Sequence, residues 1–165
     1  MTETTRSPAG DVLTNLVLAV FRLNGDFLQA AAEIAAPAGL TAARWQVLGA
    51  IIEGPLPVAE IARRMGLARQ GVQRLADILV AEGRASYAEN PGHKRAKLVV
   101  ISPEGLDAIA RLRARQHRWA NDISEGLAPD DLAGTLALIR ELARRVEDRL
   151  AKADLPPELA VAPAP

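Results

Sequence analysis

The chain has 165 residues, a formal net charge of zero and no cysteine, so disulfides, thiolate metal sites and thiol redox sensing are excluded. Hydrophobic residues make up 49% of the chain and charged residues 24%, which is the balance of an ordinary globular protein, expected here in the cytoplasm. Aromatic residues are only 3%, so Ala, Leu, Val and Ile must build the core, which suits a mainly α-helical fold.

The first predicted helix follows a flexible start. Residues 1–10 lack apolar periodicity, whereas from Asp11 to Ile34 apolar residues recur at spacings of three and four. The segment 37–39, with a proline and a glycine, ends this helix. Its longest uncharged run, Val12 to Phe21, is too short to cross a bilayer and follows no basic cluster. Neither a membrane segment nor a signal peptide is therefore expected.

Three shorter helices come next. Thr41 is a suitable N-cap for the second helix, which ends at the Gly-Pro pair 54–55. The third helix covers about 58–65 and the fourth about 68–81, with Gly66 at the turn between them. The pattern therefore predicts two helices joined by a tight, glycine-containing turn.

A hairpin and two long helices complete the chain. The stretches "RASYAE" and "KLVVI" are typical of two short strands around an Asn-Pro-Gly turn. Ser102, followed by a proline and an acid, predicts the start of a long helix to about Gly126. The last helix covers about 129–152, and the proline-rich tail 153–165 is expected to be flexible.

The segment 58–77 has the spacing of a helix-turn-helix. Small Ala62 allows close helix approach, Gly66 permits the turn, and Val72 faces the preceding helix. The second helix then presents a polar face, formed by Arg69, Gln70, Gly71, Gln73 and Arg74. Such a helix can lie in the DNA major groove, where Arg pairs with guanine and Gln with adenine. The alternative interpretation is an ordinary solvated helix face.

Gly71 is unusual inside this predicted helix. Glycine costs roughly 1 kcal/mol relative to alanine in a helix interior. The missing side chain would allow close approach to a sugar-phosphate backbone, which gives the glycine a functional explanation.

Positive charge gathers at the hairpin turn, on His93, Lys94, Arg95 and Lys97. From 60 to 97 there are eight Lys and Arg residues and four acids, a local balance of +4. DNA affinity depends on such local charge. A hairpin directly after a helix-turn-helix is typical of the wing of a winged helix, whose tip reaches phosphates or the minor groove. Alternatively, Lys94 and Arg95 are only solubilising turn residues.

The order of these elements resembles the MarR family (multiple antibiotic resistance regulators), most specifically through "VAEIARRMGLARQGVQRLADILVAEGRASYAENPGHKRAKLVVISPEGL". The resemblance implies a winged helix-turn-helix DNA-binding lobe over 41–102 and a helical dimerisation region over 11–40 and 103–152. It also implies a homodimer that binds pseudo-palindromic double-stranded DNA, more often as a repressor than as an activator. A small aromatic or phenolic effector often releases such proteins.

The resemblance assigns DNA contacts to Arg69, Gln70, Gln73 and Arg74, and minor-groove entry to Arg95. The family usually has an acid two residues before that arginine, which helps to hold the wing against the recognition helix. Here His93 stands in its place. Neutral His93 cannot make that salt bridge, whereas a charged His93 could contact phosphate, so the sequence leaves the positioning of the wing unexplained.

An apolar stripe on the last predicted helix suggests an interface. Its members follow alternating steps of four and three, at Leu132, Leu136, Ile139, Ala143, Val146 and Leu150. The stripe is either an intermolecular seam or a long intramolecular contact. We expect a dimer interface that also includes Leu13 and Leu16 of the first helix.

An effector pocket is expected only from the resemblance, between the DNA-binding lobe and the dimer helices. The candidate lining residues are Phe27, Trp45, His117 and Trp119. Each has a plainer interpretation, since Trp45 lies on an apolar helix face and His117 on a polar one.

Catalysis is not expected. The two histidines, His93 and His117, lie in different elements, and no HExxH, P-loop or GxSxG pattern is present. No cofactor or metal site is predicted. The competing class is a winged-helix interaction module that has lost specific DNA binding and uses its wing to contact a protein.

Overall fold

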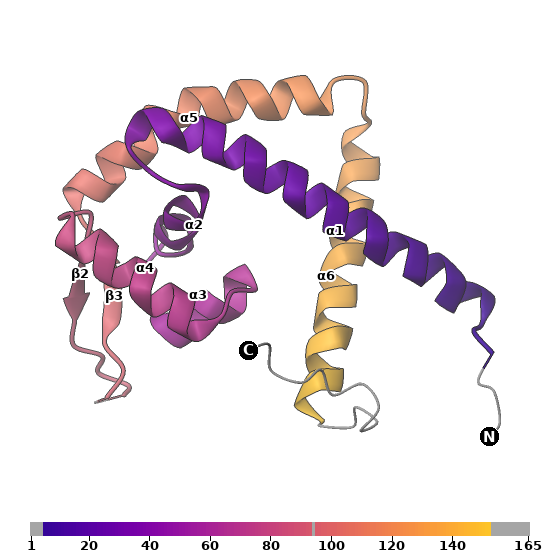
Figure 1. Cartoon of the computed structure of the whole chain (residues 1–165), viewed down its shortest axis with the longest axis horizontal. Coiled ribbons are helices and arrows are strands. Elements are labelled where there is room, and N and C mark those ends of the chain that lie inside the picture. Colours follow the sequence, from indigo (N-terminus) through magenta and orange to yellow (C-terminus); the bar gives the residue numbers. More distant parts are fainter. Residues whose placement is uncertain (1–4, 94, 153–165) are drawn as a thin grey trace, which may run out of the picture. The chain divides into compact units, whose positions relative to one another are not determined.

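The computed structural model describes residues 5–93 and 95–152. Lys94 and the predicted flexible tail 153–165 lie outside the described residues. The chain divides into two compact units, Met1–Trp119 and Ala120–Pro165 (Figure 1). Each unit is described by itself below.

The described residues confirm a mainly α-helical chain with a small sheet. The helices are α1 (Pro8–Ala35), α2 (Ala42–Ala50), α3 (Val58–Met65), α4 (Arg69–Ala81), α5 (Pro103–Ser124) and α6 (Pro129–Ala151), with a short 3-10 turn η1 (Ala36–Ala38) after α1. The strands are β1 (Leu56–Pro57), β2 (Ala85–Ala88) and β3 (Leu98–Ile101). The predicted winged helix-turn-helix is therefore confirmed in α3, α4 and the β2–β3 hairpin.

Helix α1 begins earlier than the predicted Asp11. Ser7 is its N-cap, with Oγ accepting a hydrogen bond from the Gly10 N–H at 3.1 Å, and Pro8 occupies the first turn. A capping hydroxyl followed by proline is a strong helix start. Residues 8–10 are thus helical, although they lack the apolar periodicity that marks the rest of α1.

The sheet contains a strand that the sequence pattern did not predict. The strand order in the sheet is β1-β3-β2, and both pairs of neighbouring strands are antiparallel. In β1, Leu56 pairs with Val99 and Pro57 pairs with Leu98. A two-residue strand is too short to show alternation, and proline is tolerated there because β1 is an edge strand. The wing strands are thereby joined to the start of α3.

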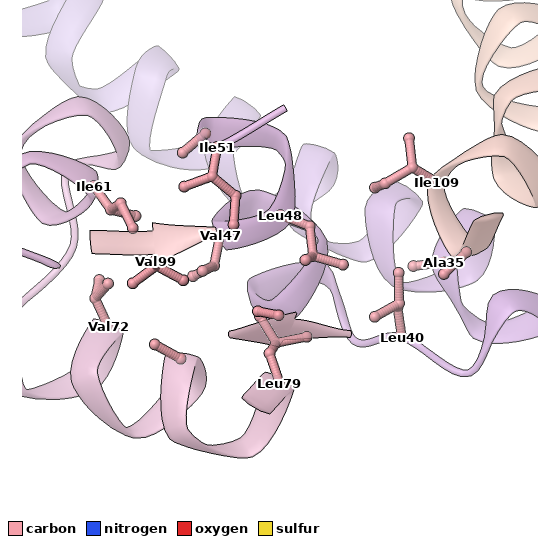
Figure 2. Packing of buried hydrophobic residues seen from close by; sticks show 14 of the residues in the cluster. Ala35, Leu40, Val47, Leu48, Ile51, Ile61, Val72, Leu79, Val99 and Ile109 are labelled. Atoms are coloured by element: carbon pink, nitrogen blue, oxygen red, sulfur yellow. The ribbon is translucent and has the colours of Figure 1, made fainter. Parts of the chain in front are cut away.

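The core of the first unit is purely aliphatic. Figure 2 shows Ile61, Val72 and Val99 gathered in one group, and the side chains of all three are fully buried. The end of α1 and the first half of α5 contribute to the same core through residues such as Ala35 and Ile109. No buried polar or charged residue occurs in the described part of the chain. This core fixes α3, α4 and the wing strand β3 together.

A compact junction connects α4, the wing and α5. Ser102 Oγ accepts a hydrogen bond from the Gly105 N–H at 3.0 Å and donates one to the Gly83 carbonyl at 2.7 Å. A Cβ at Gly105 would lie 2.2 Å from the Arg84 carbonyl oxygen, so only glycine fits there. The predicted capping role of Ser102 is confirmed, and the base of the wing is anchored.

The same C-terminal end of α4 also contacts segments that precede it in the chain. Arg44 of α2 pairs with Glu82, at the C-terminus of α4. The neighbouring Arg84 donates a hydrogen bond at 2.8 Å to the carbonyl of Gly39, which has a left-handed backbone with φ of 68°. The position of α4 is therefore defined at its end as well as by its buried face.

The described part of the second unit consists mainly of α6, which has no buried residue. Its polar face carries ion pairs, in which Glu141 accepts hydrogen bonds from Arg144 and Arg145. These bonds lower the pKa of Glu141 to about 2. Among the described residues, no helix is both long enough and apolar enough to cross a membrane.

Candidate nucleic-acid interface

The turn between α3 and α4 has the geometry predicted for it. Gly66 ends α3 in a left-handed conformation with φ of 62°. The Leu67 N–H donates to the Ala62 carbonyl at 3.0 Å, which closes the last turn of α3. Only glycine adopts this conformation without strain, so Gly66 sets the angle at which α4 leaves α3.

Helix α4 buries one face and exposes the predicted polar face. Val72, Ala76 and Leu79 are fully buried at spacings of four and three. The residues of α4 that were predicted to contact DNA are all exposed, namely Arg69, Gln70, Gly71, Gln73 and Arg74. The N-cap of α4, Ala68, makes no side-chain hydrogen bond, and the first turn has no acid. Its backbone N–H groups are therefore well suited to a phosphate.

His93 shapes the turn at the wing tip. Its backbone N–H donates to the Asn90 carbonyl at 3.1 Å, and its own carbonyl accepts from the Ala96 N–H at 3.1 Å. Its Nδ1 accepts a hydrogen bond from the Arg95 N–H at 3.3 Å. One ring nitrogen of His93 is thus used within the turn, and the exposed side chain of Arg95 extends beside it.

Cations from α4 and the wing line a shared hollow of about 340 Å³. Arg69 comes from the first turn of α4, and Arg95 and Lys97 come from the wing. The rest of the wall is formed by Pro57, Val58, Ala59, Gln73, Tyr87 and Ala96. The structure therefore brings predicted recognition-helix and wing residues to one site whose charge suits phosphate.

Charge on α3 is partly neutralised within the helix. Glu60 accepts hydrogen bonds from Arg63 at 2.8 Å and from Arg64 at 2.8 Å. These bonds lower the pKa of Glu60 to about 2. Arg63 and Arg64, which count toward the local balance of +4, are thus paired with an acid. The positive charges that line the hollow come instead from α4 and the wing.

Two residues of the site were missed by sequence reasoning. Tyr87 of β2 donates a hydrogen bond from its hydroxyl to Asp77 Oδ1 of α4 at 2.7 Å. Gln73 Nε2 donates both to Asp77 Oδ1 at 3.0 Å and to Tyr87 Oη at 2.7 Å. Lys97 Nζ lies 5.9 Å from the centre of the Tyr87 ring, within cation–π range. These contacts connect the wing to the recognition helix.

Part of this network was accessible to sequence reasoning. Gln73 and Asp77 are four residues apart, so they are neighbours on one helix face. Tyr87 is the single tyrosine of the chain, but nothing in the spacing shows which residue of α4 it meets. Burial, followed by its hydrogen bond to Asp77, raises the pKa of Tyr87 to about 12. The phenol therefore keeps its proton at neutral pH and remains a donor.

A second hollow, of about 360 Å³, contains three of the four predicted effector residues. Phe27, Trp45 and Trp119 line it together with polar side chains that include Gln46 and Gln116. The rings of Phe27 and Trp119 meet edge to face, with centroids 5.8 Å apart. Trp45 and Trp119 also pack against the core, so the packing interpretation holds as well.

His117 does not belong to this hollow. Its side chain is exposed and is not among the residues that line the second hollow. It lies on the polar face of α5, as its plainer interpretation required. The structure therefore gives His117 no place in the second hollow.

The predicted interface stripe of α6 is exposed along its length. Leu136 is 47% exposed and Val146 is 58% exposed. The other members are exposed too, namely Leu132, Ile139, Ala143 and Leu150. On α1, Leu13 is exposed and Leu16 is half-buried. Large aliphatic side chains arranged in this way are typical of a surface that a protein partner covers.

No group of three or more histidine, aspartate or glutamate side chains within 5–93 and 95–152 could hold a metal ion. The candidate site consists of cations, amides, one phenol and the carboxylate of Asp77. Its chemistry is that of binding to an anionic polymer, and its geometry is that of a helix with an adjacent wing.

Comparisons with known proteins agree with this geometry. Residues 38–96 match a family model described as MarR family. Uncharacterized proteins of Mycobacterium bovis and Mycobacterium tuberculosis are 34% identical over 132 residues, which cover 80% of this chain and 92% of each relative.

Solved structures show the same fold. A MarR-family transcriptional regulator from Silicibacter pomeroyi is 19% identical with a TM-score of 0.74, covering 90% of this chain and 99% of that one. A MarR-family regulator from Rhodococcus sp. RHA1 is 24% identical with a TM-score of 0.63, covering 84% and 96%. A MarR mutant from E. coli complexed with operator DNA is 20% identical with a TM-score of 0.68, covering 82% and 99%.

Proposed function

Because the chain belongs to the MarR family, whose members are DNA-binding transcription regulators and not enzymes, we propose that it is a repressor that binds a pseudo-palindromic operator as a homodimer. The observation that carries this proposal is the shared hollow. There Arg69 of α4 lies with Arg95 and Lys97 of the wing. A recognition helix in the major groove and a wing on the adjacent backbone require this arrangement. Such a regulator acts in the cytoplasm.

The homodimer follows from the exposed stripe of α6. A two-fold dimer places two recognition helices about one turn of DNA apart, roughly 34–36 Å. Each copy then contacts one half of a symmetric site. The stripe that includes Leu136 and Val146 supports this assembly, because it is exposed in the described chain.

The second hollow is our candidate for the effector site. Phe27, Trp45 and Trp119 supply aromatic surface for a small aromatic or phenolic compound, and Gln46 or Gln116 can orient its polar group. The effector would act by binding better to a dimer whose recognition helices are misplaced for DNA.

Fluorescence anisotropy tests the proposal. The duplexes are the upstream region of the protein's own gene and a scrambled sequence, each titrated over a salt series. We expect tight, salt-dependent binding with a clear preference for the upstream duplex, and release by aromatic acids or phenols that also change tryptophan fluorescence. A folded dimer without affinity for either duplex would instead favour a winged-helix protein-interaction module.

Gly71→Ala is expected to separate stability from DNA binding. A Cβ at Gly71 meets nothing within 4 Å, so alanine should raise the free energy of unfolding by roughly 1 kcal/mol. DNA affinity should nevertheless fall on the order of tenfold, because the added methyl group meets the DNA backbone. Urea unfolding and anisotropy measure the two effects.

Gly134→Ala is the matched control for this prediction. Gly134 lies inside α6, and a Cβ there also meets nothing within 4 Å. The control should gain similar stability and keep its DNA affinity. Undiminished DNA binding by the Gly71 variant would show that this residue does not approach the DNA backbone.

A further inference from the structure

The network around Gln73 determines which way its amide points. Asp77 contributes a carboxylate, which only accepts hydrogen bonds when it is ionised. The amide atom of Gln73 that lies 3.0 Å from Asp77 Oδ1 must therefore be the donor nitrogen, Nε2. The amide orientation, often ambiguous between nitrogen and oxygen, is fixed here by chemistry.

The hydroxyl of Tyr87 is a second acceptor for that nitrogen. Its single proton points to Asp77 Oδ1 at 2.7 Å, so Oη is left as an acceptor. The Gln73 Nε2 atom lies 2.7 Å from Oη and donates to it. Gln73, Asp77 and Tyr87 thus form a closed three-membered cycle, in which the amide nitrogen of Gln73 is directed at both acceptors.

Only the carbonyl oxygen Oε1 of Gln73 then remains for DNA. A glutamine that pairs bidentately with adenine must accept from adenine N6 and donate to N7 at the same time. Gln73 can make the first of these bonds, whereas the nitrogen needed for the second is held by Asp77 and Tyr87. Gln70 differs, because no hydrogen bond of its exposed side chain is found within the described residues.

We propose that Tyr87 and Asp77 restrict Gln73 to the role of a hydrogen-bond acceptor, so that each half-site carries a base with an exocyclic amine, cytosine or adenine, opposite Gln73. Guanine and thymine present only acceptors to the major groove and are rejected at this position. This inference rests on the proposed function, since it requires α4 to lie in the major groove. Tyr87 and Asp77 are positioning residues, because they act through Gln73.

The same cycle holds the wing against the recognition helix. Asp77 and Gln73 belong to α4, whereas Tyr87 belongs to β2 and pairs with Val99 of β3. Lys97 extends the contact through the ring of Tyr87. The wing is thus connected to the recognition helix at a point away from the turn that contains His93.

Selection from a library of duplexes with a randomised centre tests the proposal. For the wild-type dimer we expect adenine and cytosine at one position of each half-site, with guanine and thymine depleted on the order of tenfold. Gln73→Ala should remove this preference. Tyr87→Phe keeps the ring and deletes only Oη, which removes one of the two acceptors that hold the amide nitrogen, so the position should narrow to adenine on the order of tenfold over cytosine.

Gln70→Ala is the matched control. This substitution removes an amide from the same helix face and leaves the cycle of Gln73, Asp77 and Tyr87 intact. It should therefore change the base preference at a different position of the half-site and keep the adenine-or-cytosine preference. An unchanged profile for Gln73→Ala or for Tyr87→Phe would overturn the inference. If the folded wild-type dimer enriched no sequence at all, the proposed function itself would fail.

Absorbance of the single tyrosine provides a second readout that does not involve DNA. Because burial and Asp77 raise the pKa of Tyr87 from 10 to about 12, phenolate absorbance should be nearly absent at pH 10. Asp77→Asn should shift the titration to lower pH. An Asp77→Asn titration that coincides with the wild-type one would show that the cycle does not form in solution and would also overturn the inference.

Discussion

A chain carrying Leu136→Asp together with Val146→Asp is expected to be a monomer in sedimentation equilibrium. Both side chains are large, exposed and aligned on one stripe of α6. Each buried aliphatic side chain contributes about 1.5–3 kcal/mol, and a two-fold interface contains every position twice. Four lost contacts therefore weaken the dimer by about 6 kcal/mol or more, which raises its dissociation constant at least roughly ten-thousandfold.

The same double variant should lose most of its DNA affinity. A dimer gains from binding two half-sites at once, and this gain is typically about 100- to 10 000-fold. Each monomer keeps its own α4 and wing, so residual binding should depend on salt but show little sequence preference.

Ala133→Asp with Ala137→Asp is the matched control for the dimer. These exposed residues lie on α6 but outside the 4-3 stripe, and they add the same charge to the same helix. The control should remain a dimer. A dimer that survives the stripe substitutions would place the interface on another surface.

The ends of several elements could be predicted because chemical signals mark them. Thr41 caps α2, its Oγ1 accepting from the Arg44 N–H at 3.2 Å, and Gly66 ends α3 with a positive φ. Ser102 starts α5 as expected. The strand β1 could not be predicted, because two residues carry no periodicity and the pairing partner lies far along the chain.

The candidate site was only partly accessible for the same reason. Helical spacing was enough to place Gln73 on the exposed face of α4, but not to show what its amide contacts. The partner Tyr87 is brought there by the β2–β3 pairing, which is a tertiary effect. Likewise, Phe27 and Trp119 meet across two helices, whereas His117 only shares a helix with Trp119. The chemistry of a residue could be predicted from the sequence more readily than the identity of the residue that it contacts in the folded chain.

Arg95→Ala is expected to weaken binding to the specific duplex on the order of a hundredfold per dimer, because two charge-assisted contacts are lost at once. The exposed side chain lines the shared hollow beside Lys97 and makes no core contact, so stability and dimerisation should not change. Removing two phosphate-neutralising charges should also lower the slope of log affinity against log salt by about 2. Anisotropy over a salt series measures both quantities.

Two companion variants identify what Arg95 contributes. Arg95→Lys keeps the charge and should restore the salt slope, but it should not restore the sequence preference if the arginine enters the minor groove, where the guanidinium is favoured over an ammonium. Arg113→Ala removes an equal charge from an exposed position of α5 and should leave binding unchanged. If affinity survived Arg95→Ala at physiological salt, Arg95 would not contact DNA, and the positive charge of the hollow would act through Arg69 and Lys97.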